Sequence, residues 1–67
     1  MKITLNNRPE SIGKEQVSVS ELLELKNFTF KMLVIKVNGK LIKKGAYSSV
    51  NIYDGDDVTV LHLVSGG

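Results

Sequence analysis

Only one segment of this chain has the periodicity of a helix, and that segment is short. Ser18-Val19-Ser20-Glu21 fits a capping box, in which a serine hydroxyl and a glutamate three residues later satisfy backbone N–H groups at a helix start. Val19, Leu22 and Leu23 form one apolar stripe at helical spacing. We therefore predict a helix over about residues 19–26. Because isolated helices shorter than about 12–15 residues are marginal in water, this one must pack on a sheet.

The remaining segments have the patterns of strands and turns. Lys2 to Asn6 alternates polar and apolar residues, which is typical of a half-buried strand. Pro9 to Ile12 indicates a short returning strand at a sheet edge, because proline has no N–H donor. Met32 to Val37 is strongly apolar and predicts a central strand. Asn38-Gly39 predicts a type I′ hairpin turn, and Asp57 to Val64 predicts the last strand.

The order of these elements predicts the fold class. We expect an α+β fold in which one helix packs across one face of a mixed sheet of four to five strands. The strands at the two ends of the chain are expected to lie side by side. Because no repeat or linker divides the sequence, residues 1–64 are predicted to form one domain, followed by a flexible C-terminal tail at residues 65–67.

The composition excludes several classes of function. The 67 residues include no cysteine, which excludes a disulfide framework, a thiolate metal site and a cysteine nucleophile. Any sulfur chemistry must therefore use sulfur brought from elsewhere. The apolar runs are far shorter than a membrane span, and the first residues lead directly into a strand rather than a signal peptide. We expect a cytoplasmic protein.

The charge distribution gives little support for a nucleic-acid-binding function. The formal net charge is +2, and four lysines cluster in the middle of the chain: Lys36, Lys40, Lys43 and Lys44. This cluster could form a polyanion-binding surface, but a solvated strand and turn is the favoured interpretation. No arginine-rich run with interleaved aromatic residues accompanies it.

A side-chain active site is not evident in the sequence. His62 is the only histidine and lies among apolar residues of the last predicted strand, where a half-buried structural role is favoured over catalysis or metal binding. Asp54, Asp56 and Asp57 lack the further oxygen ligands that a calcium loop needs, so a tight turn is favoured there. No glycine-rich loop opens the helix, which argues against a phosphate site. We therefore predict no catalytic residues and no metal site.

The chemically interesting part of the chain is its end. The last strand leads into Ser65-Gly66-Gly67. Two successive glycines without Cβ atoms form a thin arm that a narrow enzyme channel can admit. The terminal carboxylate of Gly67 is sterically open to attack ATP at the α-phosphate, and the resulting acyl-adenylate is open to a sulfur nucleophile. The alternative interpretation is a frayed end without a function.

These features resemble a known family. Asp54-Gly55-Asp56, an apolar strand and a terminal Gly66-Gly67 together resemble the ThiS family, the sulfur carriers of thiamine biosynthesis. Asn38-Gly39 after the central strand and Ser18 to Leu23 at the helix start are also similar to that family. The resemblance covers essentially the whole chain and is most specific in its C-terminal third. It implies a ubiquitin-like β-grasp fold, which matches the predicted order of elements.

The resemblance also implies a reaction cycle. An ATP-dependent adenylating enzyme would activate Gly67, a sulfurtransferase or persulfide would displace AMP, and the thiocarboxylate would donate its sulfur to thiazole synthase. Gly67 is then the modified residue, while Gly66 and Ser65 give the tail its access to these enzymes. The chain would be a carrier and co-substrate rather than an enzyme, without a cofactor of its own.

Alternation along the last strand predicts a partner surface. Val58 and Val60 share the face expected to complete the core on the helix side. Leu61 and Leu63 are then expected on the outward face, together with Val34 if its strand is the neighbour. An exposed apolar patch beside a reactive tail would be a docking surface for the activating enzyme. The alternative is that the chain itself partly covers these leucines.

Other functions share this fold and terminus. A molybdopterin-synthase small subunit has both, but tends to be longer, with more aromatic and proline residues before the glycines than residues 61–64 provide. Carriers for cysteine or homocysteine synthesis are further alternatives. A ubiquitin-like protein modifier would instead join Gly67 to lysines, and a non-catalytic binding module would not use its end at all.

Overall fold

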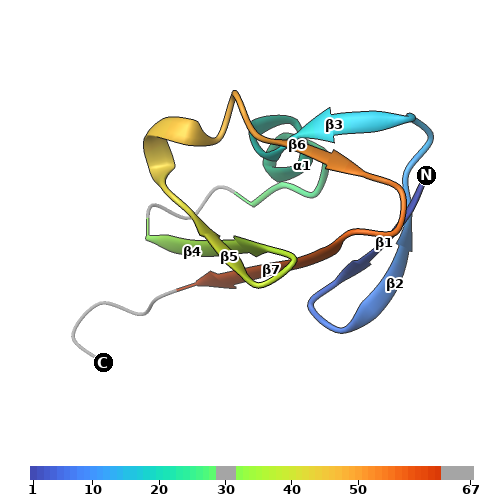
Figure 1. Ribbon diagram of the computed structural model, residues 1–67, viewed down its shortest axis with the longest axis horizontal. Helices are drawn as coiled ribbons and strands as arrows, with labels where there is room; N and C mark the ends of the chain where they lie inside the picture. Colours follow the sequence, from blue (N-terminus) through green and yellow to red (C-terminus); the bar gives the residue numbers. More distant parts are fainter. Residues whose placement is uncertain (29–31, 63–67) are drawn as a thin grey trace.

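The computed structural model describes residues 1–28 and 32–62. Five strands form one mixed sheet in the order β2-β1-β7-β4-β5 (Figure 1). Strands β1 and β7 are parallel, and every other neighbouring pair in this sheet is antiparallel. The strands are β1 (Lys2–Leu5), β2 (Arg8–Ser11), β4 (Leu33–Val37), β5 (Lys40–Ile42) and β7 (Asp57–His62). The expected pairing of the first and last strands is confirmed, as is the edge position of the strand that contains Pro9.

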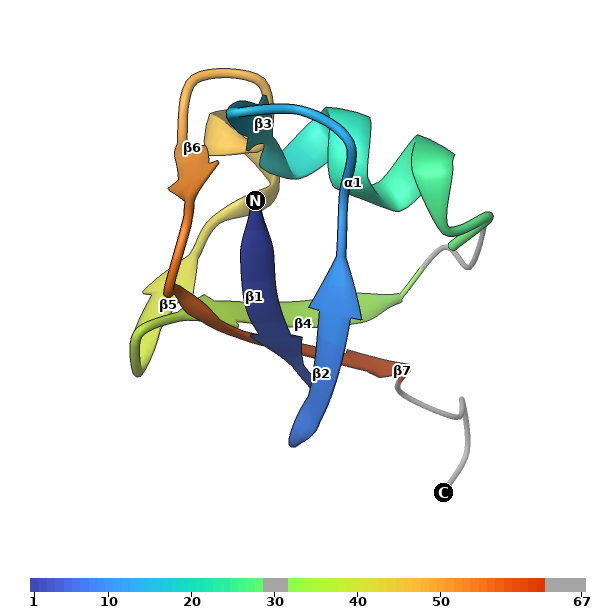
Figure 2. The same ribbon diagram turned by 90° about the vertical axis from the view of Figure 1, so that its right-hand side faces the viewer.

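The single predicted α-helix, α1 (Val19–Leu25), lies across one face of this sheet (Figure 2). It begins with the predicted capping box: Glu21 N–H donates to the Ser18 hydroxyl over 3.1 Å, and Ser18 N–H donates to a Glu21 carboxylate oxygen over 3.0 Å. That backbone N–H of Ser18 holds the pKa of Glu21 below its ordinary value of 4.5, and Lys14 nearby lowers it further. The folded helix start therefore stabilises the charged form of the Glu21 carboxylate.

The core lies between α1 and the sheet. Leu22 of the helix is fully buried, and Ile35, Val58 and Val60 are buried on the facing side of the sheet. Val58 and Val60 therefore lie on the helix side, as alternation along the last strand predicted. The remaining core residues come from β1, β3, α1, β4, β5 and β6: Ile3, Leu5, Val17, Val19, Val37, Ile42 and Ile52.

A second, two-stranded sheet was not predicted from the sequence. Strand β3 (Gln16–Ser18) pairs antiparallel with β6 (Asn51–Tyr53), and Figures 1 and 2 place both on the α1 side of the main sheet. Strands β3 and β6 have three residues each, too few for a period to be detected, and they lie far apart along the chain. A 3-10 turn, η1 (Lys44–Ala46), lies between β5 and β6.

Two turns are joined by side-chain hydrogen bonds at the start of β7. Asn38 and Gly39 have φ values of 52° and 81°, which confirms the predicted type I′ hairpin. Asn38 Nδ2 donates to Asp56 over 3.1 Å, and Asp57 N–H donates to Asn38 Oδ1 over 2.8 Å. Asp54 accepts a hydrogen bond from Lys2 N–H over 2.7 Å. The aspartates thus act as turn residues, as the sequence indicated.

Among the described residues, no helix is long and apolar enough to cross a membrane.

Candidate functional site

The predicted reactive tail, Ser65, Gly66 and Gly67, lies outside the described residues, as does Leu63. What the structure shows is the strand that leads to it. Strand β7 is central in the sheet, and it pairs with β4 from Val58 opposite Val37 to His62 opposite Leu33. The chain is therefore held in the sheet up to five residues before Gly67.

The other side of β7 is held by the first strand and by Asn6. Thr4 and Leu5 of β1 pair with the first two residues of β7. Asn6 follows β1 with a left-handed φ of 52°, and its N–H donates to the Val58 carbonyl over 2.9 Å. Its side-chain oxygen accepts a hydrogen bond from Val60 N–H over 2.8 Å. Asn6 thus continues the pairing beyond the end of β1, on a strand that β4 already holds from the other side.

The sheet face that points away from α1 bears an apolar patch. Leu61 is 51% exposed and lies directly opposite Val34, which is half-buried. Two residues away along each of these strands, and thus on the same face, half-buried Thr59 lies opposite exposed Lys36. Val34 and Leu61 thus form a cross-strand pair on the face that the sequence assigned to Leu61.

Sequence reasoning did not find the exposed leucine of this surface that lies on β5. Leu41 of β5 lies opposite Lys36 and is 58% exposed, the largest exposure among the described large hydrophobic residues. The hairpin register could have revealed it, because a two-residue turn at 38–39 sets Leu41 opposite Lys36 and Ile42 opposite Ile35. We call the combined surface the outer sheet patch: Val34, Lys36, Leu41, Thr59 and Leu61.

The described residues provide no cluster of candidate metal ligands. Within residues 1–28 and 32–62, no group of three or more histidine, cysteine or acidic side chains is placed to hold a metal ion. His62 is exposed at the end of β7, which differs from the half-buried position expected from its apolar neighbours. His62 lies opposite Leu33, the first residue of β4, in the last pair of strands β4 and β7 that the structure describes, and it is not enclosed there as Val58 and Val60 are.

The elements described define a class of protein. One helix across a mixed five-stranded sheet, with parallel first and last strands at its centre, is the ubiquitin-like β-grasp fold. The model of the ThiS family matches residues 3–67, which includes the terminal glycines. The chain belongs to the ThiS family.

Solved structures support the same assignment. The crystal structure of the thiamine biosynthesis protein (ThiS) from Geobacter metallireducens is similar over 100% of both chains, with 32% identity and a TM-score of 0.87. The NMR solution structure of a thiamine biosynthesis protein from the same organism has a TM-score of 0.79 and 32% identity, over 100% of this chain and 88% of that one. A comparison with curated proteins finds no match.

Proposed function

We propose that this chain is a sulfur carrier for thiamine biosynthesis, and that the carboxylate of Gly67 is converted to a thiocarboxylate. The observation that carries this proposal is the family match, which extends through Gly67. The crystal and NMR structures of matching fold both come from Geobacter metallireducens and are described as a thiamine biosynthesis protein, which the first of them names ThiS. The chain then acts as a co-substrate of other enzymes rather than as a catalyst.

The proposed chemistry requires a free α-carboxylate at Gly67. A carboxylate oxygen attacks the α-phosphorus of ATP and displaces pyrophosphate, which leaves an acyl-adenylate. The terminal sulfur of a persulfide, such as one held by a sulfurtransferase, then attacks the carbonyl carbon, and AMP leaves as its C–O bond breaks. A thiol cleaves the S–S bond of the resulting acyl disulfide, which releases the thiocarboxylate and leaves the thiol in a disulfide. Glycine suits both steps, because no Cβ crowds the carbonyl carbon. The thiocarboxylate finally donates its sulfur to thiazole synthase.

The position of β7 supports this use of the chain end. Strand β7 is paired through His62, so the sheet provides a fixed point from which the last residues extend. Five residues can span at most about 18 Å when fully extended. The adenylating enzyme must therefore bind within that distance of the sheet if its active site is to reach Gly67. The end of β7 beside Val34 and Leu61 fulfils this condition.

We further propose that the outer sheet patch is the docking surface for the adenylating enzyme. Leu41 and Leu61 are each more than half exposed, and both lie on the face opposite α1. Exposed apolar side chains next to a single charged residue, Lys36, have the character of an interface centre, which is depleted in charge. Leu63, in the segment that follows β7, is proposed as a further contact.

Intact-mass measurement tests the carrier function. The protein is incubated with a ThiS-adenylating enzyme, ATP, a persulfide donor and a thiol reductant, and a mass increase that corresponds to replacement of one oxygen by sulfur is expected. Deletion of Gly67 should abolish the change, and wild-type protein without ATP is the second control. High-mass conjugates to lysines would instead identify a protein modifier. An unchanged mass under all conditions would refute both functions and leave a binding module.

A second experiment tests the docking surface. Leu61→Asp should reduce the rate of ATP–pyrophosphate exchange by about tenfold or more, because it places a charge at the centre of an apolar interface. Leu25→Asp is a matched control, since Leu25 is 52% exposed but lies on α1, on the other side of the sheet. Both variants should fold. Equal exchange rates for the two variants would exclude Leu61 from the interface.

The sulfur acceptor is tested separately. Thiocarboxylate protein is supplied to thiazole synthase and, in parallel, to the catalytic subunit of molybdopterin synthase. We expect the thiocarboxylate protein to lose its sulfur in the reaction with thiazole synthase and to keep it in the reaction with the molybdopterin enzyme. Consumption only by the molybdopterin enzyme would favour that alternative, while leaving the carrier function intact.

A further inference from the structure

The main sheet has two edges of different character. Strand β2 forms one edge and contains Pro9, which has no N–H donor, and Glu10, which is paired with Lys26 over 2.9 Å. Strand β5 forms the other edge, and its residues Lys40–Ile42 include no proline. Proline on an edge strand discourages pairing with another chain, whereas an edge without it can accept one. The β5 edge is thus the one open to a further strand.

The backbone of Leu41 provides the pairing groups of this edge. In a two-residue hairpin the residues that flank the turn, Val37 and Lys40, form a hydrogen-bonded pair. The next pair, Lys36 and Leu41, is then a non-hydrogen-bonded pair, whose N–H and C=O groups point away from each other. Leu41 therefore directs both backbone groups outward from the sheet. Within the described residues, neither bonds to the backbone of another segment.

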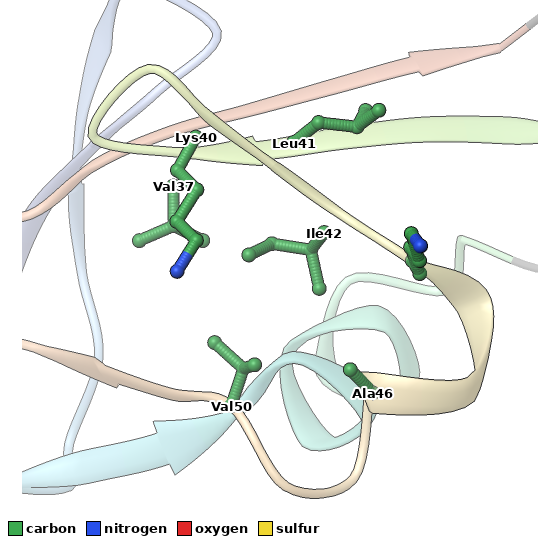
Figure 3. Close-up of a pocket in the computed structure, with 7 residues that line it drawn as sticks. Val37, Lys40, Leu41, Ile42, Ala46 and Val50 are labelled. Atoms are coloured by element: carbon green, nitrogen blue, oxygen red, sulfur yellow. The ribbon is translucent and has the colours of Figure 1, made fainter.

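An apolar pocket lies directly beside this edge, on the helix side. It has a volume of about 370 Å³, enough for an aliphatic or aromatic side chain. Figure 3 shows Ile42 of β5 facing Val50 across the pocket, with Ala46 of η1 beside them. Besides Leu41, the residues that line the pocket are Val37, Lys40, Ile42, Lys43, Ala46 and Val50. A strand added to β5 would point alternate side chains into this pocket.

The charged residues on β5, on η1 and in the pocket lining are all lysines. Residues 25–53 hold six of the nine basic residues of the chain and none of its seven acidic residues. Lys40 and Lys43 line the pocket, and Lys44 follows in η1. In the described part of the chain, ion pairs join Lys14 with Glu21 and Lys26 with Glu10, so the pocket lysines take part in neither. Their charge is open to an external partner.

We propose that β5 accepts an extended acidic peptide segment of a partner protein as an additional strand. The peptide residue opposite Leu41 exchanges two backbone hydrogen bonds with it, and a flanking apolar side chain enters the pocket between Ile42 and Val50. Acidic side chains of the peptide pair with Lys40 and Lys43. This mode is strand addition, in which main-chain bonds supply affinity and pockets for alternate side chains supply specificity.

The same charges argue against two other occupants. A second copy of this chain would bring Lys40 and Lys43 of one edge against those of the other, and like charges at such short range repel. A nucleic acid would use the lysines but neither the apolar pocket nor the backbone of Leu41, and no exposed aromatic residue from β5 or η1 offers stacking. The combination of pocket, edge and lysines fits an acidic peptide with an apolar centre.

A synthetic peptide tests the proposal directly. The probe is acetyl-Glu-Asp-Val-Leu-Val-Asp-Glu-amide, in which the central leucine pairs with Leu41 and a flanking valine enters the pocket. Titration into ¹⁵N-labelled protein should shift the Leu41 amide resonance most strongly and slow its exchange with solvent. With two backbone bonds and one pocket, a Kd on the order of 100 μM is expected, typical of a weak transient contact. An absence of binding at millimolar peptide would refute the proposal.

A control peptide with one added methyl group distinguishes binding by strand addition from binding by charge attraction. The control peptide carries N-methylation at the central leucine, which removes its N–H donor but keeps every charge and side chain. We expect its affinity to fall at least about tenfold, as a lost backbone bond in a desolvated pair implies. Equal affinity of the two peptides would overturn the strand-addition model.

Charge variants show whether peptide binding depends on the lysines of the β5 edge or on the net charge of the protein. Lys40→Glu combined with Lys43→Glu should weaken peptide binding about tenfold, whereas Lys2→Glu combined with Arg8→Glu, on β1 and β2, should leave it unchanged. Equal weakening by both pairs would overturn the proposal, as would equal competition by a single-stranded oligonucleotide. Deletion of Gly67 should leave peptide binding intact, so this test is independent of the sulfur-carrier function.

Discussion

Leu22 and Leu25 belong to the same short helix but differ completely in their surroundings. Leu22 is fully buried against the sheet, whereas Leu25 is 52% exposed. The two residues are one helical turn apart, so the same substitution at each site makes nearly the same change in helix propensity. The variants Leu22→Ala and Leu25→Ala thus isolate the contribution of packing between α1 and the sheet.

The expected magnitudes follow from these exposures. Replacement of a fully buried leucine by alanine costs about 2–5 kcal/mol, and the enclosed position of Leu22 favours about 3–5 kcal/mol. At Leu25 solvent can fill the space of the removed atoms, so the cost should stay below about 1 kcal/mol. A domain of this length has a total free energy of unfolding of only about 3–10 kcal/mol. Leu22→Ala should therefore remove a large part of it.

Urea denaturation followed by far-ultraviolet circular dichroism measures both variants. With an m-value of about 1 kcal/mol/M, Leu22→Ala should lower the midpoint by about 3–5 M, and Leu25→Ala by less than about 1 M. If Leu22→Ala is already unfolded without urea, Leu22→Val gives a measurable loss of about 1 kcal/mol. Equal losses for the two alanine variants would refute the conclusion that Leu22 anchors α1 to the sheet.

Three further predictions concern single interactions. Because the pKa of Glu21 is lowered in the folded state, its contribution to stability is complete above pH 4.5 and is lost as the pH falls through the lower folded value. Glu21→Gln should therefore flatten the acid side of the stability profile, measured by urea unfolding at a series of pH values. Gly39→Ala should lower the free energy of unfolding by about 1–2 kcal/mol, because a φ of 81° is strained for alanine although no atom lies within 4 Å of the added Cβ. Gly13 has no positive φ and also has free space, so Gly13→Ala should be nearly neutral in the same unfolding assay. Asn6→Ala should leave Val60 N–H without its acceptor, cost about 1–3 kcal/mol, and increase the hydrogen exchange of that amide. Unchanged exchange would show that the Asn6 side chain does not protect this amide.

Local features were predictable because their causes are local. The capping box at Ser18 depends on a hydroxyl and a carboxylate three residues apart, and both hydrogen bonds are present in the structure. The hairpin at Asn38-Gly39 depends on two residues that tolerate positive φ, and both adopt it. The edge position of β2 follows from the missing donor of Pro9. In each case the deciding atoms lie within a few residues of one another.

Pairing over long distances could not be read from the sequence. Gln16 of β3 pairs with Tyr53 of β6, and each of these strands has only three residues, too few for a period to emerge. The role of Asn6 was also hidden, because its hydrogen bond to Val60 joins residues that are 54 positions apart. The sequence placed Asn6 only at the end of the first predicted strand. The Val60 N–H comes within hydrogen-bonding distance of Asn6 only when β7 lies beside β1.

The sequence by itself indicated the class of this protein and suggested the proposed role of its end, and the tertiary structure decided which side chains share a surface along the strand that leads toward it. Alternation in β7 assigned Val58 to the core and Leu61 to the outer face, since side chains of a strand point to opposite sides. Leu41, by contrast, became part of the outer sheet patch only through the register of β5 against β4. The pocket beside β5 likewise required η1 and β6 to fold back toward the hairpin. Such surfaces join residues from separate elements, and only the closed core fixes their relative positions.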